Sequence, residues 1–346
     1  MTALQPTIDH DASANISGDL AQTRSAANAS EPAVSPKIWL AVAGATLGAF
    51  MAVLNIQIVN ASLADIQGAI GAGIDDGGWI STSYLIAEIV VIPLSGWLAQ
   101  VFSVRIYLLT NAFLFLALSV ACAFAQNLSQ MIVLRALQGF TGGVLIPMAF
   151  TLIITLLPKA KQPIGLALFA LSATFAPAIG PTIGGYLTEN WGWQYIFYVN
   201  LAPGALMIGM LWFSLESTPM NLSLLREGDW PGVITMAIGL SALQTVLEEG
   251  NKDDWFGSPF IIRLSIIAAV ALALFLWIEL TSKKPLLNLR LLARRTLALA
   301  SSPISGSASH STARYSSCRS ICRGSRATMP SRSAWCWPGP DCRNWS

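Results

Sequence analysis

The sequence predicts an all-α integral membrane protein, and three observations support that class. Of the 346 residues, 54% are hydrophobic and only 11% are charged, whereas a soluble globular chain carries about 25% charged residues. The apolar residues gather into runs of about 20, the length that an α-helix needs to cross a bilayer. The connections between these runs are alternately rich and poor in Lys and Arg. With so little charge to cover a water-facing surface, a soluble fold is excluded.

The leader, residues 1–36, precedes the first apolar run and is rich in Ser, Ala and Asp. It lacks the short basic segment and the early apolar segment of a cleavable signal peptide. We therefore expect residues 1–36 to form a disordered cytoplasmic N-terminal tail.

Eight apolar runs follow, and each one is a candidate membrane-spanning helix because it can cross about 30 Å of hydrocarbon. In chain order they lie near Ile38–Val59, Trp79–Ala99, Ile106–Ala125, Met131–Leu157, Ile164–Leu187, Ile196–Leu215, Gly232–Leu247 and Phe260–Leu280.

The distribution of basic residues predicts how these spans are oriented. One set of connections holds Lys37, Arg105, Lys159 with Lys161, Arg226, and the group Lys283, Lys284, Arg290, Arg294 and Arg295. In the other set, ADIQGAIGAGIDDGG, AQNLSQ and TENWGWQY contain no Lys or Arg, and EEGNKDDWFGS has one Lys among four acidic residues. Because basic connections stay on the cytoplasmic side, we expect a multi-pass protein of the cell (inner) membrane with a cytoplasmic N-terminus.

The two sets of connections also carry two simpler expectations. The basic group Lys283–Arg295 is interpreted as a topology anchor that touches anionic membrane lipid. The acidic residues of the other set are expected to form a solvated face, and they are Asp75, Asp76, Glu248, Glu249, Asp253 and Asp254.

From about residue 300 onward the composition changes. The tail holds four of the five Cys residues, six Arg and no Lys, and it has no helical or alternating period. A metal knuckle is disfavoured because no paired C-x-x-C follows Cys318 and Cys322. We interpret residues 298–346 as the disordered product of a shifted reading frame.

Several classes of chemistry have no support in the sequence. Only Cys122 lies in the apolar part of the chain, and neither His10 nor His310 lies in a span, so no metal site is expected in the membrane. No phosphate-binding loop of the form G-x-x-x-x-G-K-[ST] occurs, so the sequence does not support a process driven directly by ATP hydrolysis. No hydrolytic or redox pair is present either. We expect no enzyme, no cofactor and no nucleic-acid partner.

Three stretches of the apolar runs also contain residues that hydrophobicity alone does not explain. MIVLRALQGFTGG, Met131–Gly143, places Arg135 inside a span. FAPAIGPTIGGYL, Phe175–Leu187, places a run of Gly and Pro inside another. WGWQYIFYVNLAPG, Trp191–Gly204, begins with aromatic residues that are typical of a membrane interface.

Together these stretches resemble the major facilitator superfamily, and within it the fourteen-span drug:proton antiporters of the EmrB/QacA type. MIVLRALQGFTGG resembles the family's fourth-helix R-x-x-Q-G motif, and FAPAIGPTIGG resembles its fifth-helix G-P-x-x-G-G motif. FMAVLNIQIVNASL resembles the first-helix L-D-x-T-I-V-N-V-A-L motif, and LQTVLEEGNKDDWF resembles the loop between the two additional central helices. The resemblance runs from about Ile38 to Leu297.

The resemblance implies a domain organisation. Residues 37–218 would form the N-terminal six-helix half and residues 219–297 the two central helices. The second six-helix half would follow Arg295, and we expect it to be missing. Because alternating access needs two halves, such a chain is not expected to transport alone.

Three positions depart from the family pattern. Asn55 stands where the first-helix motif has Asp, and Gln57 stands where it has Thr. The loop after the second helix, GWLAQVFSVRIY, corresponds to the family's basic pattern G-x-L-a-D-r-x-G-r-k. Gln100 stands where that pattern has Asp. A proton carrier in the first helix and a latch in this loop are therefore both in doubt.

Two charged residues, Glu88 and Arg135, lie deep inside spans, where a charge costs about 2.5–3.5 kcal/mol. At about 1.5 Å per residue, Glu88 lies about 13 Å below Trp79, near the midplane, and Arg135 lies closer to the outer face, level with Asn55. In one interpretation, Glu88 couples protons or recognises a cation. In a second, a buried Glu88–Arg135 pair only orients helices, and in a third Glu88 hydrogen-bonds a hydroxyl such as that of Ser83 or Tyr84.

The resemblance implies export of amphipathic, often cationic compounds in exchange for protons, driven by the proton gradient. The candidates for proton coupling or for lining the substrate cavity are Glu88, Arg135, Gln138 and Asn55. The candidates for the conformational change are Gly180, Pro181, Gly184 and Gly185. Expected partners are small amphipathic substrates, protons, membrane lipid and a periplasmic membrane-fusion adaptor. The alternative is a truncated product that does not transport, or an assembly partner without transport of its own.

Overall fold

The computed structural model describes residues 34–73, 76–216, 218–226, 228–252 and 254–281. These residues fall within one unit, Met1–Leu287, and a second unit, Asn288–Ser346, lies outside them. The predictions for most of the N-terminal tail, for the basic group Lys283–Arg295 and for the tail 298–346 therefore concern residues outside the described ranges. So do those for Asp75 and Asp253.

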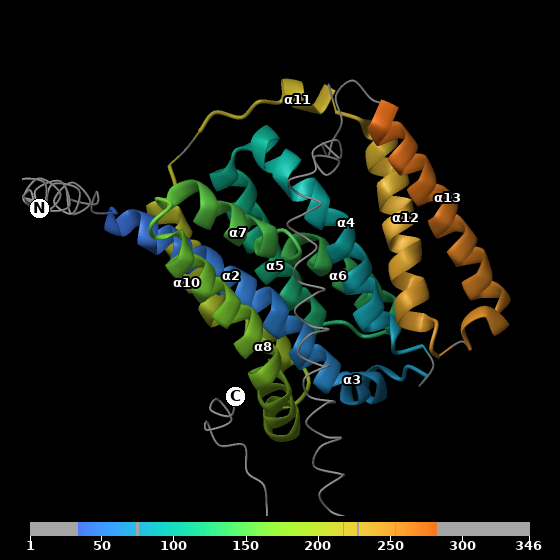
Figure 1. Cartoon of the computed structure of the whole chain (residues 1–346). Helices are drawn as coiled ribbons and strands as arrows, with labels where there is room; N and C mark the ends of the chain where they lie inside the picture. The colour runs from blue at the N-terminus through green and yellow to red at the C-terminus, as the bar shows by residue number, and fades with distance from the viewer. Residues whose placement is uncertain (1–33, 74–75, 217, 227, 253, 282–346) are drawn as a thin grey trace, which may run out of the picture. The chain divides into compact units, whose positions relative to one another are not determined.

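The described residues form helices joined by turns, with no strand among them (Figure 1). Eight helical segments in this part of the chain are long and apolar enough to cross a membrane. They are α2 (Pro36–Ala61), α4 (Trp79–Phe102), α5 (Val104–Ala123), α6 with α7 (Leu128–Gly142 and Leu145–Leu156), α8 (Gln162–Trp191), α9 with α10 (Tyr195–Tyr198 and Leu201–Ser214), α12 (Trp230–Glu249) and α13 (Pro259–Thr281). The short elements α3 (Leu63–Ile70), α11 (Ser223–Arg226) and η1 (Trp255–Gly257) lie in connections.

All eight predicted spans are confirmed, with ends that differ from the expected ones by a few residues. The helix starts follow from local chemistry. Asn127 Oδ1 accepts a hydrogen bond from Gln130 N at 2.9 Å, and Asp229 Oδ1 accepts one from Gly232 N at 3.1 Å, so both residues cap free N–H groups. Proline stands in the first turn of α2, α8 and α12, where a missing N–H costs nothing.

One predicted span is interrupted. The run Met131–Leu157 is divided into α6 and α7 at Gly143 and Val144. A Cβ atom on Gly143 would lie 2.7 Å from Val91 Cγ1 and 2.9 Å from Glu88 Cα. The absence of a side chain at this point lets the α6–α7 junction rest against the middle of α4.

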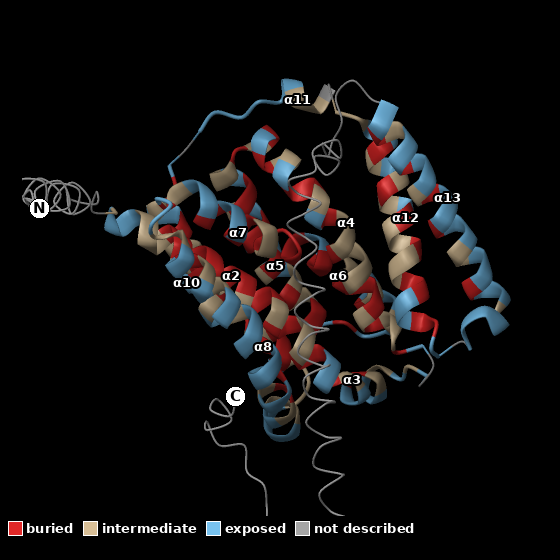
Figure 2. Ribbon diagram, viewed as in Figure 1, coloured by how far each residue is buried: buried red, intermediate tan, exposed pale blue. Residues whose placement is uncertain are grey.

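Helix α2 packs against α7, α8 and α10, while α6 packs against α4 and α5. The buried face of α2 is built from small residues, and these include Ala41, Ala45, Ala49 and Ala52. Small residues let helix backbones approach closely, which favours association in lipid, where no hydrophobic driving force acts between helices. Figure 2 shows the buried residues gathered on the sides of these helices that face one another.

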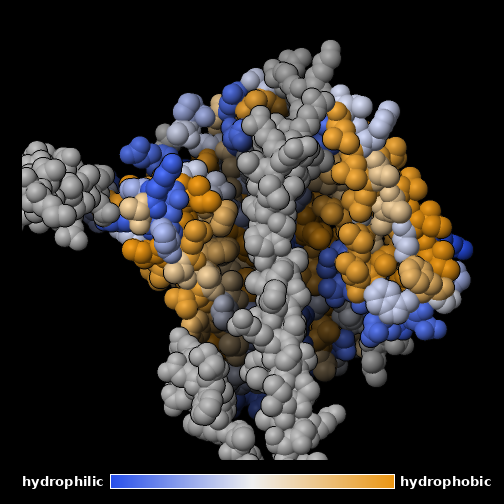
Figure 3. Space-filling view, viewed as in Figure 1, coloured by the Kyte–Doolittle hydropathy of each residue, from blue (hydrophilic) through white to orange (hydrophobic). Residues whose placement is uncertain are grey.

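Helices α12 and α13 pack against each other, and α12 also packs against α4 (Figure 1). Large apolar side chains are exposed along α13, and they include Ile262, Ile266, Val270, Leu274 and Trp277. Figure 3 shows this flank covered by hydrophobic side chains, with hydrophilic ones toward the ends. An apolar exterior over eight long helices is the surface that lipid requires, so the chain is a multi-pass membrane protein.

Candidate membrane-embedded polar site

Arg135 of α6 is completely buried and is held by three helices. Its Nη1 donates to Asn55 Oδ1 of α2 at 2.7 Å and to Gln138 Oε1, one turn along α6, at 2.8 Å. Its Nε donates to the carbonyl oxygen of Ile80 on α4 at 3.4 Å. Its guanidinium carbon lies 4.3 Å from the centre of the Tyr84 ring, which is a cation–π contact. These contacts place Asn55, Arg135 and Gln138 in one cluster.

The partners of Arg135 are neutral groups. No ion pair joins it to Glu88 within 4.0 Å, so the interpretation in which a buried Glu88–Arg135 pair orients the helices, one of the three open for Glu88, is wrong. A buried charge is costly unless hydrogen bonds replace its hydration. Here an amide oxygen from each of two side chains, one backbone carbonyl and one aromatic face supply that replacement.

Three further polar atoms of this cluster are buried and have no hydrogen-bond partner among the described residues. They are Asn55 Nδ2, Gln138 Nε2 and the hydroxyl of Tyr84. Leaving such a group unsatisfied costs about 1–3 kcal/mol. The cluster therefore has more donors than its protein acceptors can satisfy.

Glu88 lies one turn after Tyr84 on α4 and is 7% exposed. Its backbone faces Gly143 at the α6–α7 junction. Its carboxylate makes no hydrogen bond or ion pair with another described residue. The hydrogen bond to Ser83 or Tyr84 in the third interpretation is absent: the Ser83 hydroxyl donates to the Ile80 carbonyl at 3.3 Å, and the Tyr84 hydroxyl has no partner among the described residues.

The Gly/Pro run of α8 lies against α2, directly beside the cluster. A Cβ on Gly180 would lie 2.5 Å from Gln57 Cβ, and one on Gly184 would lie 2.9 Å from the Ile58 carbonyl oxygen. One turn further, Thr188 Oγ1 donates to Ser62 Oγ at 2.7 Å. These two glycines allow α8 to touch the turn of α2 that follows Asn55.

The other two residues of the predicted conformational set do not take part in this contact. Pro181 is exposed, and a Cβ on Gly185 would meet nothing within 4 Å. The structure therefore divides the four residues into a packing pair, Gly180 and Gly184, and an outward-facing pair.

Sequence reasoning missed two members of the polar cluster. In the interpretation of the sequence, Tyr84 appears only as a hydrogen-bond partner of Glu88, and the Ile80 carbonyl has no role. Cys122 of α5 is also adjacent, since its Sγ donates to Gln138 Oε1 at 3.7 Å. The spacing of Tyr84 and Glu88, four residues apart, is a signal in the sequence that both residues lie on one face of α4.

Comparisons with known proteins bear on the family. Residues 45–312 match the family model described as Major Facilitator Superfamily, and this match extends past Leu297. The colistin resistance protein EmrB of Acinetobacter baumannii is 36% identical over 261 residues, which cover 75% of this chain and 51% of that protein. The fatty acid resistance protein FarB of Neisseria gonorrhoeae is 36% identical over 250 residues, covering 72% of this chain and 49% of that protein.

The multidrug export protein EmrB of Escherichia coli K12 is 34% identical over 255 residues, covering 73% of this chain and 49% of that protein. The chain thus spans about half the length of the curated relatives that it matches. Among solved structures, a peptide transporter bound to sulfate matches with a TM-score of 0.51 and 15% identity, covering 71% of this chain and 52% of that one. At this identity the match concerns the fold alone.

Replacing Gly139 should destabilise the chain. A Cβ on Gly139 would lie 2.2 Å from the Tyr84 carbonyl oxygen, so Gly139→Val must push α6 away from α4. Overpacking of this kind costs about 1–3 kcal/mol or more, and we expect a lower apparent melting temperature in detergent. Gly185→Ala is the matched control, because its new methyl group meets open space. Equal melting temperatures for the two variants would contradict this account.

Introducing a carboxylate at Asn55 should stabilise the chain. In Asn55→Asp, the oxygen that accepts from Arg135 Nη1 at 2.7 Å would carry a negative charge, which makes the hydrogen bond charge-assisted on both sides. We expect a higher apparent melting temperature, by about 2–4 °C for each kcal/mol gained. Asn55→Ala removes the acceptor and should lower it. If Asn55→Asp and Asn55→Ala shift the melting temperature equally, residue 55 does not act by stabilising the Arg135 charge.

Proposed function

The chain belongs to the Major Facilitator Superfamily, and from this membership we propose that it forms the N-terminal six-helix half, with the two central helices, of a multidrug exporter. The exporter would move amphipathic, often cationic compounds out of the cell in exchange for protons. The printed names of the relatives include colistin resistance, fatty acid resistance and multidrug export, which supports a broad amphipathic substrate class.

The observation on which this proposal depends is the environment of the Glu88 carboxylate. This carboxylate lies in the middle of a membrane span, is nearly buried and has no protein partner among the described residues. Acidic residues inside the membrane are expensive and mark ion or proton pathways. A single carboxylate that binds either a proton or a cationic substrate, but not both at once, is sufficient for their exchange.

Arg135, Asn55 and Gln138 take a supporting role in the proposal. Their hydrogen bonds fix α2 and α6 beside the face of α4 that carries Glu88. The unpaired Asn55 Nδ2 and Gln138 Nε2 donors would line the polar part of the substrate path. Proton coupling is assigned to Glu88 because Asn55 does not titrate.

We assign the conformational change to the contact between α2 and α8. Gly180 and Gly184 pack without side chains against Gln57 and Ile58, which gives a smooth surface on which α8 can shift. Pro177 and Pro181 each remove one backbone hydrogen bond from α8, which makes bending of this helix cheaper. Gly185, with open space around it, would allow such a shift without a clash.

The proposed location is the inner membrane with the N-terminus in the cytoplasm. Support comes from the alternation of basic residues, with Lys37, Arg105, Lys159 and Lys161 in connections at one end of the spans. Compounds would then leave toward the periplasmic side, where a membrane-fusion adaptor would receive them.

A second candidate is that this chain does not transport alone and acts only as an assembly partner. It is favoured by one observation, the coverage of about half the length of the relatives. Alternating access moves one half against another around a site at the membrane midplane. On this candidate, transport would need a complementary half.

Accumulation of a fluorescent cationic amphipath in cells expressing this chain separates the two candidates. Under the assembly-partner candidate, we expect accumulation equal to that of cells carrying an empty vector. Accumulation below that of the empty-vector cells would establish transport by the chain itself if it depends on the proton gradient and if Glu88→Gln restores the empty-vector level. Lower accumulation that is unchanged by Glu88→Gln would contradict the coupling role of Glu88.

Binding measured on the purified chain tests Glu88 without requiring transport. We expect Glu88→Gln to weaken binding of a lipophilic cation such as tetraphenylphosphonium by about tenfold, which corresponds to about 1.4 kcal/mol. Glu248→Gln is the matched control, because Glu248 is exposed and its one hydrogen bond among the described residues is accepted from Gln244 of the same helix, at 3.1 Å. Equal affinities of wild type and both variants would remove Glu88 from the cation site.

A further inference from the structure

Helix α12 meets α4 at both of its ends. Near the start of α12, the Trp230 ring packs edge-on against Trp97 of α4, with ring centres 5.9 Å apart. At the other end, the last residue of α12, Glu249, contacts the first turn of α4. Between the two ends lies an apolar cluster made by Leu94, Met236 and Phe275. The central helix pair is therefore docked on α4 along its length.

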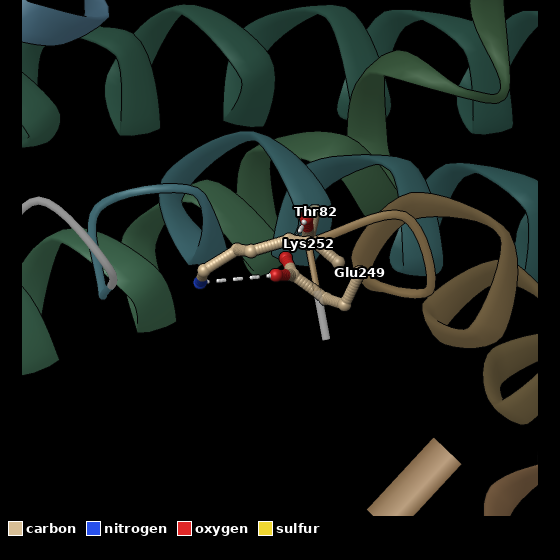
Figure 4. Close-up of polar contacts among 3 residues, drawn as sticks. All are labelled: Thr82, Glu249 and Lys252. Carbon is tan, nitrogen blue, oxygen red and sulfur yellow. Dashed lines mark hydrogen bonds and ion pairs between the residues drawn. The ribbon is translucent and has the colours of Figure 1, made fainter. Parts of the chain in front are cut away.

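Glu249 makes the polar part of this docking contact (Figure 4). Its Oε1 accepts a hydrogen bond from Thr82 Oγ1 at 2.8 Å, and its Oε2 lies 3.3 Å from Lys252 Nζ. The residue is 4% exposed, so the expected solvated position of Glu249 is wrong. The expectation holds for its neighbour Glu248, which is exposed because one residue along a helix turns the side chain by about 100°.

The turn of α4 that Glu249 contacts is also the turn that holds the buried arginine. Thr82 lies two residues after Ile80, whose carbonyl accepts from Arg135 Nε. Gly78, at the start of this turn, lies beside the carboxylate, since a Cβ there would be in ordinary van der Waals contact with Glu249 Oε1 at 3.5 Å. Thr82 N donates to the Gly78 carbonyl at 3.1 Å, which closes the turn. The Thr82–Glu249 hydrogen bond and the Ile80 carbonyl that accepts from Arg135 thus lie on the same turn of α4.

We propose that Glu249 is a positioning residue for the Arg135 cluster. By accepting from Thr82, it holds the first turn of α4 so that the Ile80 carbonyl and the Tyr84 ring face Arg135. The two central helices then support the polar site of the six-helix half and are more than a connector. Burial of a carboxylate is costly unless partners compensate it, and at Glu249 the partners are Thr82 and Lys252. This role goes beyond the proposed transport function and does not depend on the identity of any substrate.

Cys122 provides a reporter of the cluster within the chain. It is completely buried, and its thiol donates to the same Gln138 oxygen that accepts from Arg135 Nη1. Its rate of alkylation by N-ethylmaleimide follows the fraction of molecules in which this region opens. Mass spectrometry of the peptide that contains Cys122 measures this rate in the full 346-residue chain, separately from the four cysteines of the tail.

We expect Glu249→Ala to raise the labelling rate of Cys122 about tenfold, because a hydrogen bond to a charged group is lost and the first turn of α4 is released. Thr82→Val removes the same hydrogen bond while keeping the side-chain shape, and it should also raise the rate. Glu249→Gln keeps an oxygen that can accept from Thr82 and should label at close to the wild-type rate. Glu248→Ala, next along the helix but exposed, should leave the rate unchanged.

The proposal is overturned if Thr82→Val labels Cys122 at the wild-type rate while Gln138→Ala labels it faster, because the reporter then responds to the cluster but not to the Glu249 contact. It is also overturned if Glu248→Ala raises the rate as much as Glu249→Ala does. Should Glu249→Ala fail to fold, the Thr82→Val result decides. Labelling requires no ligand, so this outcome is independent of whether the chain binds or exports any compound.

Discussion

The buried positive charge of Arg135 is the constraint on which the arrangement of α2, α4 and α6 depends. A charge in the membrane interior is tolerated only when polar groups of the protein replace the water that it has lost. The replacement groups come from all three helices, as the Asn55 amide, the Gln138 amide and the Ile80 carbonyl. Each must lie within hydrogen-bonding distance at the same time. The three helices therefore have little freedom to slide or rotate relative to one another.

This arrangement requires backbones to approach more closely than side chains usually allow. Gly139 faces the Tyr84 carbonyl across the α4–α6 contact, and any larger residue would separate Arg135 from Ile80. On the other side of α2, Gly180 and Gly184 bring α8 against the turn after Asn55. In lipid, close packing and interhelical hydrogen bonds supply the association energy that the hydrophobic effect supplies in water. The glycines are therefore part of the polar site, although they carry no polar side chain.

The number, order and approximate ends of the spans could be predicted because hydrophobic length alone determines them. The depth of Asn55 and Arg135 could be predicted as well, since a helix rises by a constant amount per residue. The side of the helix on which each polar residue lies could not, because α4 and α6 are apolar on most faces and give no strong periodic signal. For this reason a Glu88–Arg135 pair is one of the interpretations that the sequence allows, whereas Arg135 bonds Asn55 and Gln138. Glu249 was misassigned for a related reason, since only the tertiary contact with α4 distinguishes it from Glu248.

Arg135 and Glu88 form no direct pair, and the residue at position 55 affects how their charges can still interact. In the resembling family an Asp stands at this position, and a carboxylate there would neutralise the arginine. Asn55 supplies an acceptor without a charge, so the positive charge of Arg135 is not cancelled within the cluster. Tyr84 contacts Arg135 through its ring and lies one turn from Glu88 on the same helix face. In a medium of low dielectric, charges interact over distances well beyond a hydrogen bond. Loss or gain of a proton at Glu88 would therefore change the energy of the Arg135 cluster through space, across Tyr84, without any direct contact between the two charged groups.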